Sequence, residues 1–243
     1  MNGIILHEGP STFTGEPLVS VATLTSRNRK TGDIPQVWHL LKDRSAAQAV
    51  ATGTDSGNCG SCKYRGNCGC YVRTAEAPGN IWRSLGGYQR GKKALDLMKR
   101  YAAFVGIARN SAYGDPAAVD ADGDEQIRRL FYGVALLDYT HAWQTRPDLM
   151  DRCMASVDTS QEREQAKAAG WRTFRVAPAG SPLEKGEILC PATAGSKRIQ
   201  CLDCRLCAGG NTRKAPDVLE HLHGPTKKAQ AAIAGRLIQI GEK

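Results

Sequence analysis

Residues 153–176 read CMASVDTSQEREQAKAAGWRTFRV and decide the fold class. The apolar run 153–158 predicts a strand, and Thr159 is a typical helix N-cap, followed by acidic side chains in the first helical turn. Gly170 is a typical helix C-cap, and the run 171–176 predicts the next strand. A strand, a helix and a second strand in so short a stretch form a β-α-β unit, which favours a parallel sheet.

The same alternation extends on both sides of this unit. The other predicted strands are 18–25, 37–41, 104–108, 131–137 and 217–224, and the other predicted helices are 45–51, 92–102, 124–130, 146–152 and 226–238, the last of them basic. The first two strands flank a polar turn and predict a hairpin. From 104 to 176 strands alternate with helices, so we expect an α/β protein with a partial (βα) barrel-like core and two four-cysteine metal-binding loops.

We expect a single α/β domain over 1–243, because a chain of this length can build one large core. Its expected parts are an N-terminal hairpin with a first cysteine cluster (18–70), a βα core (92–176), a second cysteine cluster (187–210), and a C-terminal strand and basic helix (211–243).

Composition argues against a membrane-spanning protein and against a secreted disulfide scaffold. Hydrophobic residues make up 41% of the chain, and no apolar run approaches the ~20 residues that a membrane helix needs. Residues 1–10 lack the basic and then apolar pattern of a secretory signal. We therefore expect a cytoplasmic protein, in whose reducing compartment cysteine pairs bind metals or do redox work.

The formal net charge of +9 favours an anionic partner, with nucleic acid or a nucleotide as the first candidate. The densest basic patch is 26–30, Ser-Arg-Asn-Arg-Lys. It is suited to holding phosphates, although a solvated hairpin turn has the same composition.

Eight of the nine cysteines fall into two groups of four. The first cysteine group is Cys59, Cys62, Cys68 and Cys70, and the second cysteine group is Cys190, Cys201, Cys204 and Cys207. Four thiolates are the ligand set of a tetrahedral zinc site and of a cubane iron–sulfur cluster. The spacing Cys-x2-Cys-x2-Cys in the second group, with a remote Cys-Pro, resembles the ligand run of bacterial-type ferredoxins. We expect two [4Fe-4S] clusters, with zinc as the alternative, and we expect Cys153 to be a small core residue.

The order of these features resembles that of radical S-adenosylmethionine enzymes. In that family a cysteine loop follows the first strand of a partial barrel, and three thiolates hold a cubane whose fourth iron binds the cofactor. Here the first cysteine group follows a predicted strand, Tyr71 follows Cys70 as in the family's Cys-Tyr ending, and Gly114-Asp115-Pro116 is similar to the family's Gly-Glu-Pro motif. The resemblance implies that S-adenosylmethionine binds at Tyr71, Gly114, Asp115 and Pro116. It also implies that the second group holds an auxiliary cluster and that an electron donor is a partner.

The sequence differs from that family in two respects. The family loop is Cys-x3-Cys-x2-Cys, which no three cysteines of the first group match, and Asp115 is one carbon shorter than the family's glutamate. The chain also resembles uncharacterised phage and plasmid proteins, which implies the cytoplasm of a bacterium or of a phage-infected cell. Three functions stay open: a radical enzyme, a barrel-like iron–sulfur protein with other chemistry, and a zinc- or iron–sulfur-stabilised nucleic-acid-binding protein of a mobile element.

Three polar residues follow predicted strands and are candidate catalytic residues: Asp115, His141 and Asp158. Ligands gather at the carboxyl ends of parallel strands, so these side chains are expected around one pocket. His141 is suited to act as a general acid/base or as a ligand. Alternatively, such residues cap helices, which suits Asp158 because Thr159 follows it directly.

Overall fold

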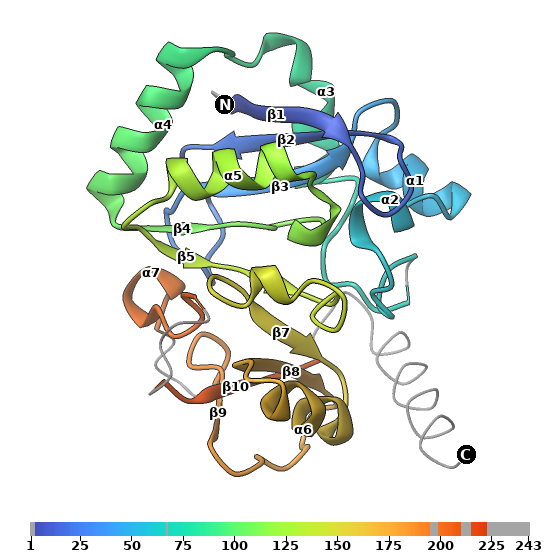
Figure 1. The fold of residues 1–243 in the computed structure, drawn as a ribbon, viewed down its shortest axis with the longest axis vertical. Helices are drawn as coiled ribbons and strands as arrows, with labels where there is room; N and C mark the ends of the chain where they lie inside the picture. Colours follow the sequence, from blue (N-terminus) through green and yellow to red (C-terminus); the bar gives the residue numbers. More distant parts are fainter. Residues whose placement is uncertain (1–2, 67, 195–198, 210–214, 223–243) are drawn as a thin grey trace.

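The structure is a computed structural model that describes residues 3–66, 68–194, 199–209 and 215–222, and its strands form two sheets of five (Figure 1). The first sheet contains β1 (Gly3–Pro10), β2 (Pro17–Thr23), β3 (Gln36–Leu41), β4 (Ile107–Arg109) and β5 (Ala135–Leu137). The second contains β6 (Tyr139–Thr140), β7 (Met154–Val157), β8 (Thr173–Ala177), β9 (Glu187–Leu189) and β10 (Asp217–His221). The described α-helices are α1 (Ala46–Thr52), α2 (Ser56–Cys59), α3 (Ala77–Arg83), α4 (Lys92–Val105), α5 (Ala121–Leu130), α6 (Ser160–Ala168) and α7 (Cys201–Cys204), with 3-10 turns η1 (Leu85–Gly87), η2 (Pro116–Ala118) and η3 (Pro147–Leu149). The predicted helix at 226–238 lies outside the described residues.

The first sheet has the strand order β1-β2-β3-β4-β5 and mixes both pairing directions. β1, β2 and β3 are antiparallel neighbours, so the predicted hairpin is confirmed, with Val21 opposite Trp38. β4 and β5 then join β3 in parallel. Sequence analysis does not predict β1, which adds an antiparallel strand at the edge of this sheet.

The second sheet has the order β6-β7-β8-β10-β9, and all of its pairs are parallel. The predicted β-α-β unit is present as β7, α6 and β8. The Thr159 hydroxyl caps α6 by accepting a hydrogen bond from the Glu162 N–H at 3.0 Å. The prediction of an α/β fold is therefore confirmed.

The chain passes from the first sheet to the second at Asp138, the residue that separates β5 from β6. On the first-sheet side the carbonyl of Leu137 accepts from Asn110 N–H at 2.9 Å. On the second-sheet side the carbonyl of Asp138 accepts from Met154 N–H at 3.0 Å. Figure 1 shows the two sheets one above the other, with α4 and α5 beside the first and α6 beside the second.

Three predicted elements are shorter than expected. Phe131 is buried at the end of α5, and the strand predicted over 131–137 begins only at Ala135, after a turn with Gly133 at φ 75°. The strand predicted over 104–108 begins at Ile107, because α4 continues to Val105. The helix predicted over 146–152 is limited to η3.

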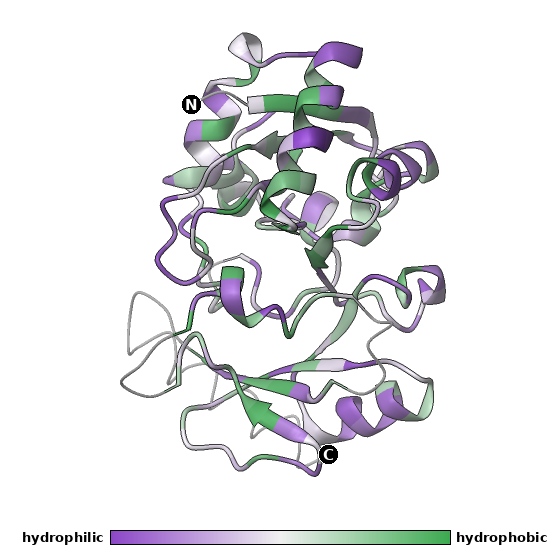
Figure 2. Ribbon diagram, turned by 90° about the vertical axis from the view of Figure 1, so that its left-hand side faces the viewer, coloured by the Kyte–Doolittle hydropathy of each residue, from purple (hydrophilic) through white to green (hydrophobic). Residues whose placement is uncertain are grey.

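The buried hydrophobic residues of the described structure form five clusters. Figure 2 shows hydrophobic residues concentrated on the strands of both sheets. α4 and α5 contribute Met98 and Ile127, both fully buried, to the core beside β1 and β4. Of the helices in the described ranges, none is long and apolar enough to cross a membrane.

Candidate functional site

One cavity of about 340 Å³ brings together most of the predicted site residues. Its lining includes seven cysteines, Cys59, Cys62, Cys70, Cys190, Cys201, Cys204 and Cys207, together with Tyr71, Gly114, Asp115 and His141. Cys68, Pro116 and Asp158 lie outside this lining. Strands of both sheets form the cavity wall, so the two cysteine groups, more than 100 residues apart in sequence, face the same space.

The first cysteine group lies in a loop that Asp55 organises. The Asp55 side chain is 1% exposed, and it accepts hydrogen bonds from Arg65 Nη1 at 2.7 Å and from Gly66 N–H at 2.8 Å. Cys59 ends α2, and Cys70 N–H donates to the Tyr64 carbonyl at 2.9 Å. A buried carboxylate thus shapes the loop from within, as a second layer of contacts commonly does around metal ligands.

The second cysteine group is carried by α7 and by the end of β9. α7 rests on the basic turn at 26–30, because Cys201 N–H donates to the Lys30 carbonyl at 3.0 Å. Cys190 N–H donates to the Leu219 carbonyl of β10 at 2.8 Å. The Lys30 ammonium also lies in the cavity wall, 2.5 Å from Glu220 Oε2. The turn that sequence analysis singled out for its charge therefore supports the second group directly.

Burial keeps several of these thiols protonated when no metal is bound. It raises the pKa of Cys70 to about 11, of Cys190 to about 11 and of Cys207 to about 12, and it raises the pKa of Cys59 well above its usual value. Metals bind thiolates, so loading of these sites would release protons.

The thiols of the cavity lining are candidate metal ligands. Within the described ranges, no three His, Cys, Asp or Glu side chains are grouped around one point as ligands of a single ion. The thiols instead surround a cavity, and in a cubane cluster each thiolate binds a different iron atom. Cysteine sulfur is a soft ligand that favours iron–sulfur clusters and zinc.

Asp115 and His141 form a hydrogen-bonded unit on the cavity wall. Asp115 Oδ1 accepts from Thr140 Oγ1 at 2.8 Å and from Ala117 N–H at 2.9 Å, and Oδ2 accepts from His141 N–H at 2.8 Å. Burial raises the pKa of Asp115, but the contacts with His141 and Ala117 outweigh it and hold the pKa below the usual value. The carboxylate is therefore ionised at neutral pH.

The His141 ring connects Asp115 to the first cysteine group. Its Nδ1 lies 3.7 Å from Asp115 Oδ2, and its Nε2 lies 3.2 Å from Ser156 Oγ. Burial lowers the pKa of His141, but Cys62 and Asp115 together raise it well above its usual value. The ring is therefore suited to hold a proton beside Cys62 at the cavity wall.

Gly114 has a backbone conformation that only glycine adopts readily here. Its φ is +88°, and a Cβ on it would lie 2.7 Å from the His39 carbonyl oxygen. Asp115 follows as the N-cap of η2, which begins with Pro116. The Gly-Asp-Pro motif thus forms a tight turn that fixes Asp115 at the wall of the cavity.

Asp158 has a different environment from Asp115. It is buried outside the cavity lining, its N–H donates to Glu162 Oε2 at 2.8 Å, and its carboxylate lies 3.5 Å from Lys63 Nζ. Burial raises its pKa. These contacts belong to the start of α6, which favours the alternative that Asp158 has a structural role.

Arg109 and Tyr139 are among the residues of the cavity wall that sequence analysis did not select. Arg109 ends β4, and its Nη2 donates a hydrogen bond to the Tyr71 hydroxyl. Tyr139 opens β6, and a hydrogen bond links its hydroxyl to Cys207. The position of Tyr139 was a usable signal, because it lies two residues before the selected His141, whereas Arg109 has no selected residue beside it in the sequence.

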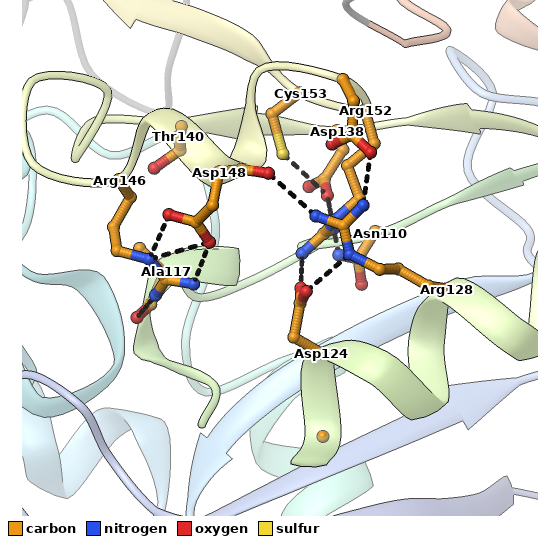
Figure 3. Close-up of polar contacts among 12 residues, drawn as sticks. Asn110, Ala117, Asp124, Arg128, Asp138, Thr140, Arg146, Asp148, Arg152 and Cys153 are labelled. Atoms are coloured by element: carbon orange, nitrogen blue, oxygen red, sulfur yellow. Dashed lines mark hydrogen bonds and ion pairs between the residues drawn. The ribbon is translucent and has the colours of Figure 1, made fainter. Parts of the chain in front are cut away.

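A buried charge network lies beside the cavity (Figure 3). Asp138 Oδ2 accepts from Arg152 Nη1 at 2.5 Å, from Asn110 Nδ2 at 2.8 Å and from Cys153 Sγ at 3.2 Å. Arg152 also pairs with Asp124 on α5. Cys153 is fully buried, so its prediction as a core residue is confirmed.

The function has to be inferred from these residues. Comparison of the chain with models of protein families, with curated proteins and with solved structures finds no match.

Proposed function

We propose that this chain is an iron–sulfur protein whose two cysteine groups hold [4Fe-4S] clusters beside one shared cavity. The observation that carries the proposal is that two loops far apart in sequence present seven thiols to the same space. Structural zinc sites have all four positions filled by protein ligands, whereas catalytic zinc sites keep an open position. Thiols that line a common cavity therefore favour chemistry over a purely structural role.

In the first site, we propose that Cys59, Cys62 and Cys70 are the ligands. All three line the cavity, whereas Cys68 does not. A cluster held by three thiolates leaves one iron free for another ligand, which is the arrangement that the resemblance to radical S-adenosylmethionine enzymes requires. In those enzymes, the cluster together with bound S-adenosylmethionine supplies a radical that abstracts hydrogen from a substrate.

The chain's own groups around the first site suit S-adenosylmethionine. The ionised Asp115 carboxylate is a counter-ion for the cofactor's amino group, in place of the glutamate of the resembling family. Tyr71 is 44% exposed and lies in the same wall, where its ring can cover a bound ligand. Cys62 and Asp115 raise the pKa of His141, so its ring is suited to donate a proton to a substrate.

A partial barrel explains how strands of both sheets contribute to one cavity. Alternate residues line it on successive strands: Leu137, Tyr139 and His141 around β6, Phe174 and Val176 on β8, and Val218 and Glu220 on β10. Side chains on a strand alternate between its two faces, so these residues share a face. We propose that the parallel strands from β3 onward curve around this face, as in a (βα) barrel that does not close.

The first experiment is iron and sulfide analysis with an absorption spectrum on protein purified without oxygen. The proposal predicts about eight irons per chain with matching sulfide and a broad absorption band, as two cubane clusters give. Cys62→Ala should remove about half of the iron, and the matched variant Cys68→Ala should keep all of it. Two zinc ions and no colour would refute the proposal, and loss of iron in Cys68→Ala would refute the three-cysteine assignment.

A second candidate function is a metal-stabilised nucleic-acid-binding protein without catalysis. It is favoured by Arg27 and Arg29, which are exposed on the turn that supports α7 and form no ion pair within the described residues. Asn28 and Lys30 of the same turn line the cavity, so phosphates bound at the turn would lie at the cavity. The same observation favours a nucleotide or nucleic acid as the substrate of the proposed enzyme.

Binding measurements separate the two functions. A single-stranded oligonucleotide should bind with an affinity that falls steeply with salt, and replacement of both Arg27 and Arg29 by Ala should reduce the slope. Oligonucleotide binding together with S-adenosylmethionine binding to the iron-loaded protein would support the enzyme. Oligonucleotide binding without any affinity for S-adenosylmethionine would favour the second function.

A further inference from the structure

Arg109 ends β4, which lies between β3 and β5 in the first sheet. Its N–H donates to the Pro35 carbonyl at 2.9 Å, and it pairs with Leu137 in the neighbouring strand β5. Its side chain lines the cavity. Its Nε is buried and has no hydrogen-bond partner among the described residues, so one donor of the guanidinium is available to a group in the cavity.

On one side, Arg109 is linked to the first cysteine group. Its Nη2 donates to the hydroxyl of Tyr71, the residue that follows Cys70. Cys70 and Tyr71 line the same cavity as Arg109.

On the other side, Arg109 is linked to the second cysteine group through the backbone. Leu137 pairs with Arg109 in one direction and forms a β-bridge with Ala208 in the other. Ala208 follows Cys207, and Cys201 and Cys207 pack against the buried cluster that contains Leu137. Cys201 and Cys207 also line the same cavity as Arg109.

The other cations of the cavity wall have narrower connections. Lys30 pairs with Glu220, and its carbonyl accepts from Cys201 N–H of the second group. Arg205 lies between Cys204 and Cys207 of the second group, and its Nε donates to the Leu202 carbonyl at 3.1 Å. Arg65 pairs with Asp55 in the loop of the first group. Arg109 is thus connected to both groups.

We infer that Arg109 is a positioning residue shared by the two metal centres, whose guanidinium stabilises the negative charge of both and so sets the reduction potential of both. The inference rests on the proposed function, because it requires iron–sulfur clusters at both groups. A positive charge close to an anionic cluster favours the reduced form. Removal of that charge should therefore lower the reduction potential at both centres.

The test measures the reduction potential of each metal centre separately. In a Cys204→Ala background the first centre remains, and in a Cys62→Ala background the second remains; redox titration followed by electron paramagnetic resonance gives the potential of each. Arg109→Met should lower both potentials. Arg109→Lys, which keeps the charge, should leave both close to those of the parent. The control Arg65→Met removes a cavity cation of the first group only, so it should leave the potential of the second centre unchanged.

Each outcome is decisive. An unchanged potential at either centre in Arg109→Met would overturn the shared role. If Arg109→Met lost iron from both sites and Arg109→Lys retained it, the result would support the inference that both centres need the positive charge at this position. Loss of iron in both variants would overturn the inference in favour of a role in folding. A parent protein without iron would refute the proposed function itself, a result that the iron analysis shows before any Arg109 variant is made.

Discussion

Replacement of Arg152 by Met should destabilise the fold strongly. Arg152 is 9% exposed at its side chain and pairs with two carboxylates, those of Asp138 and Asp124. Asp138 is fully buried at the junction between β5 and β6 (Figure 3). Without Arg152, Asp138 would be left as a buried charge with only neutral partners, whereas Met would fill a similar volume.

The expected magnitude follows from the contacts that remain. Asp138 keeps Asn110 Nδ2 at 2.8 Å and Cys153 Sγ at 3.2 Å, and Asp124 keeps Arg128 at 2.7 Å. Removal of one partner of a buried ion pair costs about 3–5 kcal/mol, because the other charge stays desolvated. For a chain of this size that loss lowers the melting temperature by about 6–20 °C.

The assay is equilibrium unfolding in urea, with Arg129→Met as the control. The Arg129 side chain is 77% exposed and pairs with Glu125, so its loss should cost no more than about 0.5 kcal/mol. The double variant of Arg152→Met with Asp138→Asn should recover part of the stability, because it removes the unpaired charge. A loss below about 1 kcal/mol in Arg152→Met would refute the assignment of a buried ion pair.

The loss of stability in Arg152→Met should depend on pH, in a direction that follows from the pKa of Asp138. Burial raises the pKa of Asp138 in spite of the opposing Arg152 charge, and loss of Arg152 should raise it further. A carboxyl whose pKa is higher in the folded than in the unfolded state binds the proton more tightly when folded, so the stability it contributes falls as pH rises through that window. The difference in stability between the parent and Arg152→Met should therefore narrow as the pH is lowered from neutral towards the usual Asp value.

The remaining predictions concern the site. Asp115→Ala should weaken S-adenosylmethionine binding with unchanged iron content, measured by titration of the loaded protein; unchanged affinity would remove the analogy with the Gly-Glu-Pro motif. Cys204→Ala should strip the metal from the second site and lower the unfolding midpoint, and full metal content would contradict its role as a ligand. Gly114→Ala should cost about 1–3 kcal/mol in urea unfolding, since φ is +88° and the new Cβ would lie 2.7 Å from the His39 carbonyl oxygen; a neutral effect would show that the turn relaxes.

The elements that sequence analysis predicted well are those with local signals. The β-α-β unit at 153–176 has a capping Thr159, a terminal Gly170 and an apolar run on each side, so neighbouring residues decide it. Short apolar runs without such signals were ambiguous. The run 131–137 contains Phe131, which is buried at the end of a helix, and Tyr132, which is 87% exposed in a turn. Apolar residues alone do not distinguish a strand from a helix end.

The grouping of cysteines was visible in the sequence, but their convergence on one cavity was not. It depends on contacts between distant segments, such as α7 on the turn at 26–30 and Ala208 on Leu137. Arg109 could not be selected for the same reason, because its role requires Tyr71 and Leu137 to be placed around it. The prediction that Asp115 and His141 lie close together followed from the general rule that ligands gather at the carboxyl ends of parallel strands. That rule does not require knowledge of contacts between distant segments.

The segment 137–141 brings these conclusions together. Leu137, Tyr139 and His141 line the cavity, and the intervening Asp138 and Thr140 bond to Arg152 and Asp115 respectively. Because strand side chains alternate, one face of this segment lines the cavity, and the other face holds Asp138 in the buried charge network and Thr140 against Asp115. Variants at 139 and 141 should therefore alter metal loading or ligand binding with little change in unfolding free energy, whereas variants at 138 should act first on stability. Urea unfolding and iron content measured on the same His141→Gln and Asp138→Asn proteins would separate the two faces, and equal effects on both measurements in both proteins would contradict the division.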